Sequence, residues 1–295
     1  APAKAKLSWI PGAGVKAHKV FFGTDADNLK YVGRFEKGDS SEVILPKLQT
    51  CQKYFWQVDA EKSDGSMIKG KLWSFYTGKM VVRYKFDETD GEITPDSSGN
   101  NLHGKLVGDA HIISDPVRGD VLNLDGDGDY VEVKNLGLKT NSVTFMAWIN
   151  GWKVDDWAGI VFHRSGSDRD ELACGMSFGN YDTLHYTWND NDQTTYNWEG
   201  GPVIPKNKWA MVAVAIEPSK ATAYICTETD GLQKGVNNIP HIQQSINSVM
   251  IGWDDHSHFL NRRFCGKMDD VRIYNYALSE DEIRAIYTGK DPVSI

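Results

Sequence analysis

Two segments, one near the middle of the chain and one near its end, constrain the fold most. The first, Leu122–Val133, places the acidic turn Asp125-Gly-Asp-Gly-Asp129 between two short alternating runs. The second, Gly266–Ile283, holds an alternating run followed by a short helical pattern with Ser279 as N-cap. Runs in which apolar and polar residues alternate predict half-buried β-strands. Because similar runs recur along the chain, we predict an all-β protein with one short helix near the C-terminus.

The first 78 residues form a separate group of short alternating runs, spaced roughly 8–15 residues apart and divided by turn signals. Leu48 followed by Tyr54 is similar to the tyrosine corner of fibronectin type III modules. This resemblance implies a β-sandwich at residues 1–78 that acts as a spacer. The short stretch Thr77–Met80 is the expected linker to the next domain.

Residues 82–290 contain five landmarks in a fixed order. They are a polar loop, the acidic turn, an aromatic strand, a strand hairpin and a closing strand, at residues 96–104, 125–133, 142–149, 208–226 and 266–274. Together they resemble a laminin G-like domain of the concanavalin A-like, pentraxin-like kind. The resemblance implies a jelly roll of two antiparallel sheets with a short C-terminal helix, and a binding function more often than catalysis.

Composition excludes several classes of partner. The net charge is −8 and the basic residues form no visible face, so nucleic acid is not an expected partner. No apolar run approaches the ~18 residues of a membrane-spanning helix. The start Ala-Pro-Ala-Lys reads as part of a larger exported, bacterial protein, which we expect to be secreted or at the cell surface. The four cysteines match no zinc motif, and both disulfides and free buried thiols remain open.

The acidic turn at 125–129 is not an EF-hand. The sixth position of that motif requires Gly and the twelfth requires Glu, whereas this chain has Tyr130 and Leu136. We interpret the turn as a Gly-rich hairpin with solvated acids.

A structural calcium ion is expected elsewhere, because many domains of the resembled family join the polar loop to the closing strand with one. The resemblance implies carboxylates from Asp96 and Asp269 and carbonyl oxygens from Asn101 and Gly104. Strand alternation places Asp269 on the same inward face as Val271, where a carboxylate needs a partner. A carboxylate satisfied by loop amides is the alternative.

Residues 152–198 and 253–258 combine aromatic with polar side chains. Aromatic rings stack on the apolar faces of sugars, and polar groups bond the hydroxyls. The candidate ligand-binding residues are Trp157, Trp188, Tyr196, Trp198 and Trp253 for stacking, and Arg164, His185 and Asp190 for polar contacts. The alternative is that Trp188 and Trp198 brace long loops.

The sequence therefore predicts a non-catalytic carbohydrate-binding module with a structural calcium ion and a polysaccharide or glycan partner. An adhesion or cell-surface assembly module that binds protein is the alternative. A glycosidase is a third hypothesis, but the Glu-x-Asp-x-x-Glu strand of jelly-roll glycosidases is missing from the sequence. We expect no enzymatic activity.

Overall fold

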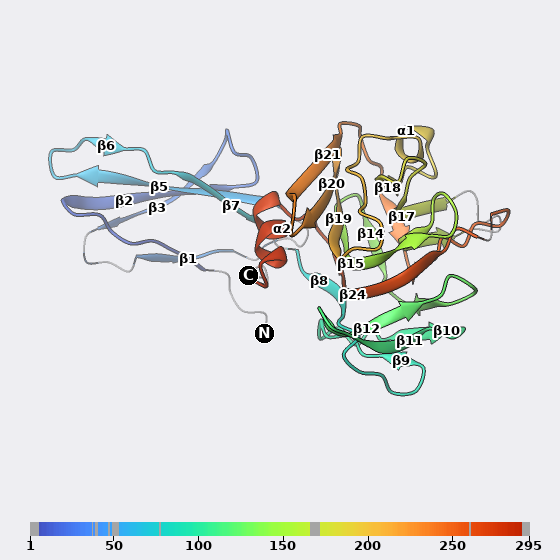
Figure 1. Ribbon diagram of the computed structural model, residues 1–295. Coiled ribbons are helices and arrows are strands. Elements are labelled where there is room, and N and C mark those ends of the chain that lie inside the picture. Colours follow the sequence, from blue (N-terminus) through green and yellow to red (C-terminus); the bar gives the residue numbers. More distant parts are fainter. Residues whose placement is uncertain are drawn as a thin grey trace. The chain divides into compact units, whose positions relative to one another are not determined.

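The computed structural model describes residues 6–36, 38, 41–46, 48, 53–76, 78–165, 172–259 and 261–290. The chain divides into two compact units between Lys79 and Met80, and each is described by itself (Figure 1). Strands dominate both units, so the all-β prediction is confirmed.

Among the described residues, neither helix has the length and hydropathy of a membrane-spanning segment. Cys51 lies outside the described residues; Cys174, Cys226 and Cys265 are free thiols.

The first unit pairs a five-stranded sheet with a two-stranded one. The large sheet has the order β3-β2-β5-β6, with β7 also on β5, and the small sheet pairs β1 with β4. The bounds are β1 Lys6–Ser8, β2 Val15–Gly23, β3 Lys30–Glu36, β4 Glu42–Ile44, β5 Lys53–Lys62, β6 Met67–Ile68 and β7 Leu72–Tyr76. The buried ring of Tyr54 stacks on Phe22 and Phe75, at centroid distances of 5.0 and 5.7 Å. The fibronectin type III identity of this unit stays a prediction.

An apolar groove of about 720 Å³ remains open in the first unit. Trp9, Trp56 and Trp73 line it together with Val58 and Ile68. Both strands of the small sheet are only three residues long, and the groove is lined by the chain that follows β1 together with residues of β2, β5, β6 and β7.

The second unit is a sandwich of two antiparallel sheets, as a jelly roll requires. One sheet has seven strands in the order β18-β17-β16-β23-β13-β10-β9, and the other has eight, β11-β12-β24-β15-β19-β20-β21, with β8 also on β24. The first ten bounds are β8 Met80–Tyr84, β9 Ile93–Thr94, β10 Gly104–Val107, β11 His111–Asp115, β12 Gly119–Leu124, β13 Tyr130–Val133, β14 Leu138–Thr140, β15 Val143–Lys153, β16 Gly159–Ser165 and β17 Leu172–Phe178. The others are β18 Leu184–Thr187, β19 Ala210–Glu217, β20 Lys220–Thr227, β21 Gly231–Asn237, β22 Gln244–Ile246, β23 Val249–Ile251 and β24 Phe264–Tyr274. A large buried core, to which Phe145, Met176 and Val212 belong, fills the space between the sheets.

The acidic turn joins the two sheets. β12 before it pairs with β11 and β24 in the eight-stranded sheet, whereas β13 after it pairs with β10 and β23 in the seven-stranded one. The prediction that the strands on either side of the acidic turn pair as a hairpin is therefore wrong. Both flanking strands exist, but sequence alternation does not show whether neighbouring strands pair with each other.

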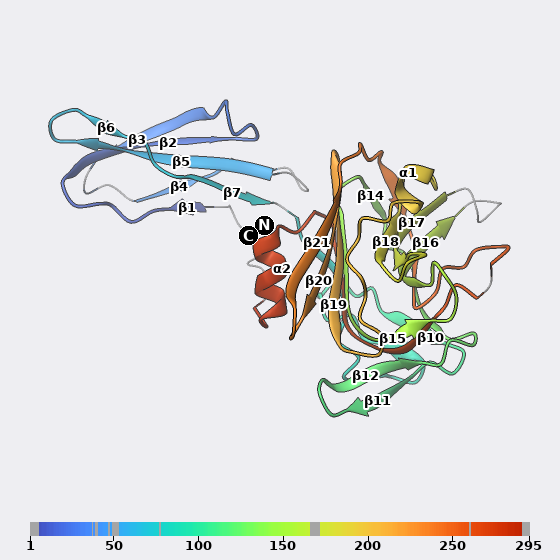
Figure 2. The same ribbon diagram turned by 45° about the horizontal axis from the view of Figure 1, so that its top comes forward.

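The predicted C-terminal helix is confirmed as α2, Glu280–Tyr287. Ser279 and Glu282 form a capping box, and Ile283 and Ile286 are buried. The ring of Tyr287 stacks on Trp148 of β15 at 5.5 Å, so α2 lies against the outer face of the eight-stranded sheet (Figure 2). A second helix, α1 at Gln193–Tyr196, is a single turn that the sequence did not predict.

The closing strand β24 carries a β-bulge that changes which face its acidic residues occupy. Opposite β15, the register passes from Arg272 to Asp269 with one extra residue on β24, and Asp270 has a φ of 45°. Met268 and Val271 are both in the core, while Asp269 lies directly opposite Trp148 on the outer face. The prediction that Asp269 and Val271 share an inward face is wrong, because the bulge breaks the two-residue alternation.

Buried ion pairs at this bulge connect β24 to other parts of its sheet. Asp270 accepts from Arg83 Nε of β8 at 2.8 Å and from Arg272 Nε at 2.9 Å. Asp269 accepts from Arg118 Nε, in the turn between β11 and β12, at 2.6 Å. Burial favours the neutral carboxyl of Asp270, but the guanidinium groups of Arg272 and Arg83 outweigh it and lower its pKa.

We expect Asp270→Asn to destabilise the second unit by about 3–5 kcal/mol, because it removes the carboxylate that pairs with the buried guanidinium of Arg272. Asn tolerates a positive φ, so the backbone is not the cause. Calorimetric unfolding measures the effect, with the exposed Asp87→Asn as the matched control. Equal midpoints for the two variants would contradict the role of the bulge.

Candidate functional site

The outer face of the seven-stranded sheet carries a row of polar side chains. In antiparallel sheets, residues directly opposite each other lie on the same face. Cys174 and Met176 belong to the core, so Ser177 and its partner His185 lie on the outer face, as do Arg164 and Thr187. In these buried strands, the polar residues that alternate with core residues therefore face outward.

A pocket of about 310 Å³ lies over these strands. Its lining comes from β16, β17, β18, α1 with the segment that leads into it, the loop 154–158 and the described parts of the loop 252–263. The lining residues are Trp157, Arg164, Ser177, Thr187, Asn191, Tyr196, Asp254, His256, Phe259 and Arg262. A smaller hollow of about 180 Å³ shares Arg164 and also includes Phe162, Met250 and Asp255.

Asp254 joins two arginines at the pocket. Arg164 bonds both of its carboxylate oxygens, with Nη2 at 2.9 Å from Oδ2, and Arg262 Nη1 lies 3.0 Å from Oδ2. The side chains of Arg164 and Asp254 are 4 % and 1 % exposed. A buried bidentate pair holds both groups in a defined geometry.

Two aromatic rings of the pocket lining lie near Arg262. Its guanidinium carbon lies 5.1 Å from the ring centroid of Trp157 and 4.7 Å from that of Phe259.

Trp157 has a φ of 59°, which is unusual for a bulky residue. A Cβ at Gly159 would lie 2.4 Å from the backbone of Trp253, so the two loops meet closely here. Strain of this kind collects at functional sites.

Two buried polar atoms of lining residues, Ser177 Oγ and Trp157 Nε1, have no hydrogen-bond partner among the described residues. His185, opposite Ser177 on the same face, is almost completely buried and is not part of the lining. Burial lowers the pKa of His185 to about 4, although the backbone carbonyl of Tyr196 opposes the shift. Unpaired buried polar atoms cost about 1–3 kcal/mol each, so these atoms lower the stability of the fold.

Three of the eight predicted ligand residues, Trp157, Arg164 and Tyr196, line this one pocket. His185 lies on the same face, opposite Ser177, but is only 2 % exposed. The sequence spacing did not show that these residues meet; the pairing of β16, β17 and β18 brings them together.

The other four predicted residues lie elsewhere. Trp188 is completely buried and donates from Nε1 to the Ile242 carbonyl at 2.8 Å, so it cannot stack on a sugar and the structure corrects that prediction. Trp198 packs on the core beside Tyr186, as a loop brace would. Asp190 accepts from Gln244, and Trp253 contacts Tyr130 and Arg263 outside the pocket lining.

The sequence did not single out Ser177, Thr187, Phe259 and Arg262. One signal was available for the first two, because each is a polar residue within a short, otherwise apolar run. Nothing in the sequence indicated that the guanidinium of Arg262 lies near the rings of Trp157 and Phe259, since that depends on the path of a long loop.

The predicted calcium ligands have other partners. The carboxylate of Asp96 accepts from the backbone amides of Arg83, Ser98 and Leu102 and from the Ser98 hydroxyl, all at 2.8–3.1 Å. Asp269 accepts from Arg118 and from the Asp270 amide. Burial raises the pKa of Asp269 to about 6, while the guanidinium of Arg118 opposes this. Both carboxylates are thus satisfied by protein groups: backbone amides and a hydroxyl at Asp96, and chiefly the guanidinium of Arg118 at Asp269.

The other two predicted calcium ligands, Asn101 and Gly104, were expected to contribute backbone carbonyl oxygens. Asn101 is exposed and has a φ of 59°. Gly104 is buried at the start of β10, where a Cβ would lie 2.7 Å from Val131. A cation at Asp269 would compete with Arg118, so this set fits calcium poorly.

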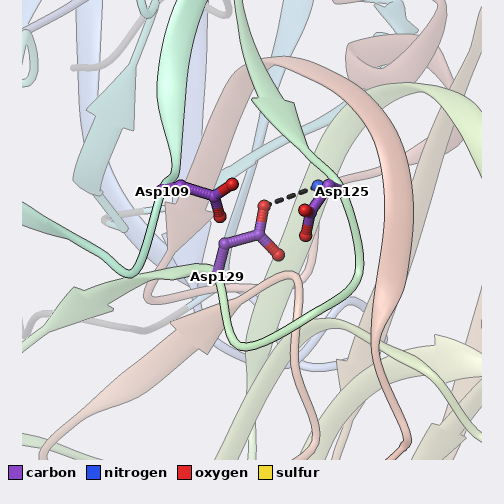
Figure 3. A group of neighbouring side chains, drawn as sticks. All are labelled: Asp109, Asp125 and Asp129. Atoms are coloured by element: carbon purple, nitrogen blue, oxygen red, sulfur yellow. Dashed lines mark hydrogen bonds between the residues drawn. The ribbon is translucent and has the colours of Figure 1, made fainter.

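A different acidic group lies at the turn between the sheets. Asp109, Asp125 and Asp129 offer carboxylate oxygens that all lie within 4.8 Å of one another and face a common space (Figure 3). Asp129 is buried and accepts from the amides of Asp125 and Gly126 at 2.6 and 3.1 Å. Burial raises its pKa despite these amides. Asp129 is therefore not one of the solvated acids expected from the sequence.

The fold and the sequence agree on the family. Residues 125–284 match the family model Laminin_G_3, described as the concanavalin A-like lectin/glucanases superfamily. The match covers more than half of the chain, which therefore belongs to this family. No curated protein sequence matches the chain significantly.

Two solved structures share the fold. Domain 4 of AbnA, a GH43 extracellular arabinanase from Geobacillus stearothermophilus solved with arabinotriose, is 19 % identical with a TM-score of 0.51, and the match covers 71 % of this chain and 98 % of that one. Trypanosoma rangeli sialidase solved with 2,3-difluorosialic acid is 10 % identical with a TM-score of 0.51, over 81 % of this chain and 43 % of the sialidase. At these identities the likeness concerns the fold alone.

The low pKa of His185 predicts a loss of stability in acid. Above pH 6.5 the imidazole of His185 is neutral in both the folded and the unfolded state. Between pH 6.5 and about pH 4 the unfolded chain binds a proton at His185, whereas the folded chain does not. We expect about 3 kcal/mol to be lost over this range. Urea unfolding at successive pH values should show a smaller decline for His185→Gln, with some slope left because burial also lowers the pKa of His163 and His241. Parallel curves for both proteins would contradict this assignment.

Proposed function

We propose that this chain is a non-catalytic carbohydrate-binding module of a larger exported bacterial protein, and that its glycan binds in the pocket over β16, β17 and β18. The observation that carries the proposal is the composition of that pocket. Aromatic and polar side chains line it together, and two of the lining residues, Ser177 and Trp157, carry a buried polar atom without a hydrogen-bond partner. This combination suits a sugar, which has apolar faces and a rim of hydroxyls.

The family supports this function, since it includes lectins as well as glucanases. The similar AbnA domain was solved with arabinotriose, which makes a glycan the first class of ligand to test. Fold likeness by itself does not decide function, so the proposal depends on the pocket.

The carboxylates of the pocket favour binding over hydrolysis. Glycosidases of the common types use two carboxyl groups about 5–9.5 Å apart on either side of the scissile bond. Within the described lining, Asp254 is the only carboxylate, and two arginines bond its oxygens. Because both of its oxygens accept from guanidinium groups, this carboxylate is not free to attack a sugar carbon as a nucleophile.

The first unit acts as a fibronectin type III-like spacer in this proposal. One observation favours a second candidate function, adhesion to a protein. Exposed apolar side chains are frequent on this unit, including Ile10 at 95 % and Trp73 at 51 %, beside its open apolar groove. Large exposed apolar surfaces often mark protein contacts.

The carbohydrate proposal predicts that Tyr196→Ala lowers glycan affinity about tenfold, because a stacked ring contributes roughly 0.5–1.5 kcal/mol beyond its buried area. Calorimetric titration of the purified chain against a panel of soluble polysaccharides and oligosaccharides measures this. Tyr181→Ala is the matched control, since Tyr181 is 66 % exposed and outside the pocket lining. Equal losses in both variants, or no binding across the panel, would contradict the proposal and favour the protein-binding function.

A structural calcium ion remains part of the proposal, with the acidic triad at the turn between the sheets as its position. Three carboxylates there can share one cation, and calcium prefers oxygen ligands. The carboxylates of Asp96 and Asp269 already accept hydrogen bonds from backbone amides and from Arg118, so they are not available to a cation. An ion at the triad would hold the turn 108–109 against the turn 125–129.

Calcium should then raise the melting temperature of the second unit by roughly 2–4 °C for each kcal/mol of binding free energy. Asp109→Asn should remove the effect at little cost to folding, because Asp109 is exposed. Asp269→Asn should retain it. Calorimetric scans with calcium and with a chelator test both variants, and a calcium effect lost only in Asp269→Asn would restore the ligand set expected from the sequence.

A further inference from the structure

Three consecutive residues after β18 have a left-handed backbone conformation. Asn189, Asp190 and Asn191, which we call the left-handed turn, have φ values of 53°, 55° and 65°. Among the described residues, every other non-glycine residue with a positive φ stands alone in the chain. Asn and Asp tolerate this region better than other side chains, but normally as single residues. The left-handed turn is therefore strained, and strain of this kind persists only where the surrounding structure holds it.

Hydrogen bonds from a neighbouring segment hold the left-handed turn. The side-chain amide of Asn189 donates to the Pro240 carbonyl at 3.0 Å, and its oxygen accepts from the Ile242 amide at 2.9 Å. The carboxylate of Asp190 accepts from the side chain of Gln244 at 3.0 Å. The turn is thus tied to the connection between β21 and β22.

The stretch that follows the left-handed turn closes back onto the residue that precedes it. Thr195 Oγ1 accepts from the Trp188 amide at 3.0 Å, and the Asp192 amide donates to the Trp188 carbonyl at 3.1 Å. The side chain of Asn237 on β21 donates to the Thr194 carbonyl at 3.0 Å. The backbone is therefore held on both sides of the turn.

This stretch supplies part of the pocket lining. Thr187 ends β18, Asn191 ends the left-handed turn, and Tyr196 ends α1; all three line the pocket. The two side chains that tie the turn to its neighbour, Asn189 and Asp190, are not part of the lining. Such a division is expected where one residue positions others, because a preorganised binding surface loses less conformational entropy when its ligand binds.

We propose that Asn189 is a positioning residue of the glycan pocket: it holds the left-handed turn in its strained form and so sets the positions of Asn191 and Tyr196. This inference rests on the proposed carbohydrate-binding function and adds to it a residue outside the lining. Asn suits the position because its side chain both donates and accepts and its backbone tolerates a positive φ. A residue with a structural role alone would affect stability without affecting affinity.

The test uses substitutions that separate the strain of the backbone from the hydrogen bonds of the side chain. Asn189→Gly relieves the strain, because glycine adopts a positive φ freely, but it removes both side-chain hydrogen bonds. We expect it to lower the affinity about five- to tenfold for the oligosaccharide that the wild-type chain binds most tightly in a panel, measured by calorimetric titration. Asn189→Asp should recover part of the affinity, since it tolerates the φ and keeps an acceptor for the Ile242 amide.

The matched control is Asn207→Gly. Asn207 has a φ of 51°, is exposed and lies outside the pocket lining, so this variant should bind like the wild type. Double-mutant cycles locate the effect of Asn189→Gly. The loss of affinity should shrink in a Tyr196→Ala background and remain in full in a Phe259→Ala background, because Phe259 lines the pocket from another loop.

Two outcomes would overturn the inference while the carbohydrate function stands. One is unchanged affinity in Asn189→Gly although Tyr196→Ala weakens binding; the other is an equal loss in both backgrounds, since Asn189 would then not act through Tyr196. Absence of wild-type binding to every oligosaccharide would instead remove the proposed function itself. Thermal melts show whether each variant is folded, and the comparison of Asn189→Asp with the wild type decides the question if Asn189→Gly does not fold.

Discussion

The second unit depends on the way in which its closing strand is held. β24 pairs with β15 along one edge and with β12 and β8 along the other, so the eight-stranded sheet cannot form without it. A bulge at Asp270 turns two consecutive carboxylates toward arginines from distant parts of the chain. A buried carboxylate needs hydrogen-bond donors or a partner of opposite charge. Guanidinium groups supply it, which is the function that the sequence had led us to expect of calcium.

The seven-stranded sheet differs because its outer face carries polar side chains. One of its faces packs into the core, while the other presents Ser177, His185 and Thr187 beneath loops that carry rings and charges. Leaving polar atoms unpaired there lowers stability, and a fold optimised for stability alone would satisfy them. Such local conflict is typical of binding sites, where a ligand completes the hydrogen bonding. The rigid strands hold the base of the pocket, and the loops set its walls.

The candidate site could be predicted only in part. Trp157, Arg164 and Tyr196 were identified because stacking rings and polar groups cluster in that stretch of sequence. Trp188 shares the same composition yet is fully buried, with its Nε1 bonded to a loop carbonyl. Composition does not separate these cases, because a tryptophan is equally suited to a core and to a sugar. Arg262 and Phe259 were missed because their positions depend on a loop that folds back over Trp157.

The sequence by itself determined the class of fold. Alternation and turn residues encode strands locally, and Ser279 with Glu282 encodes the start of α2, because each signal acts over a few residues. The tertiary structure alone decided the rest: that β12 and β13 enter different sheets, that Asp269 faces Arg118 and not the core, and which aromatic rings meet Arg262. These outcomes depend on strand pairing and on one inserted residue at a bulge. Both arise from contacts between residues far apart in the chain, which no local pattern records.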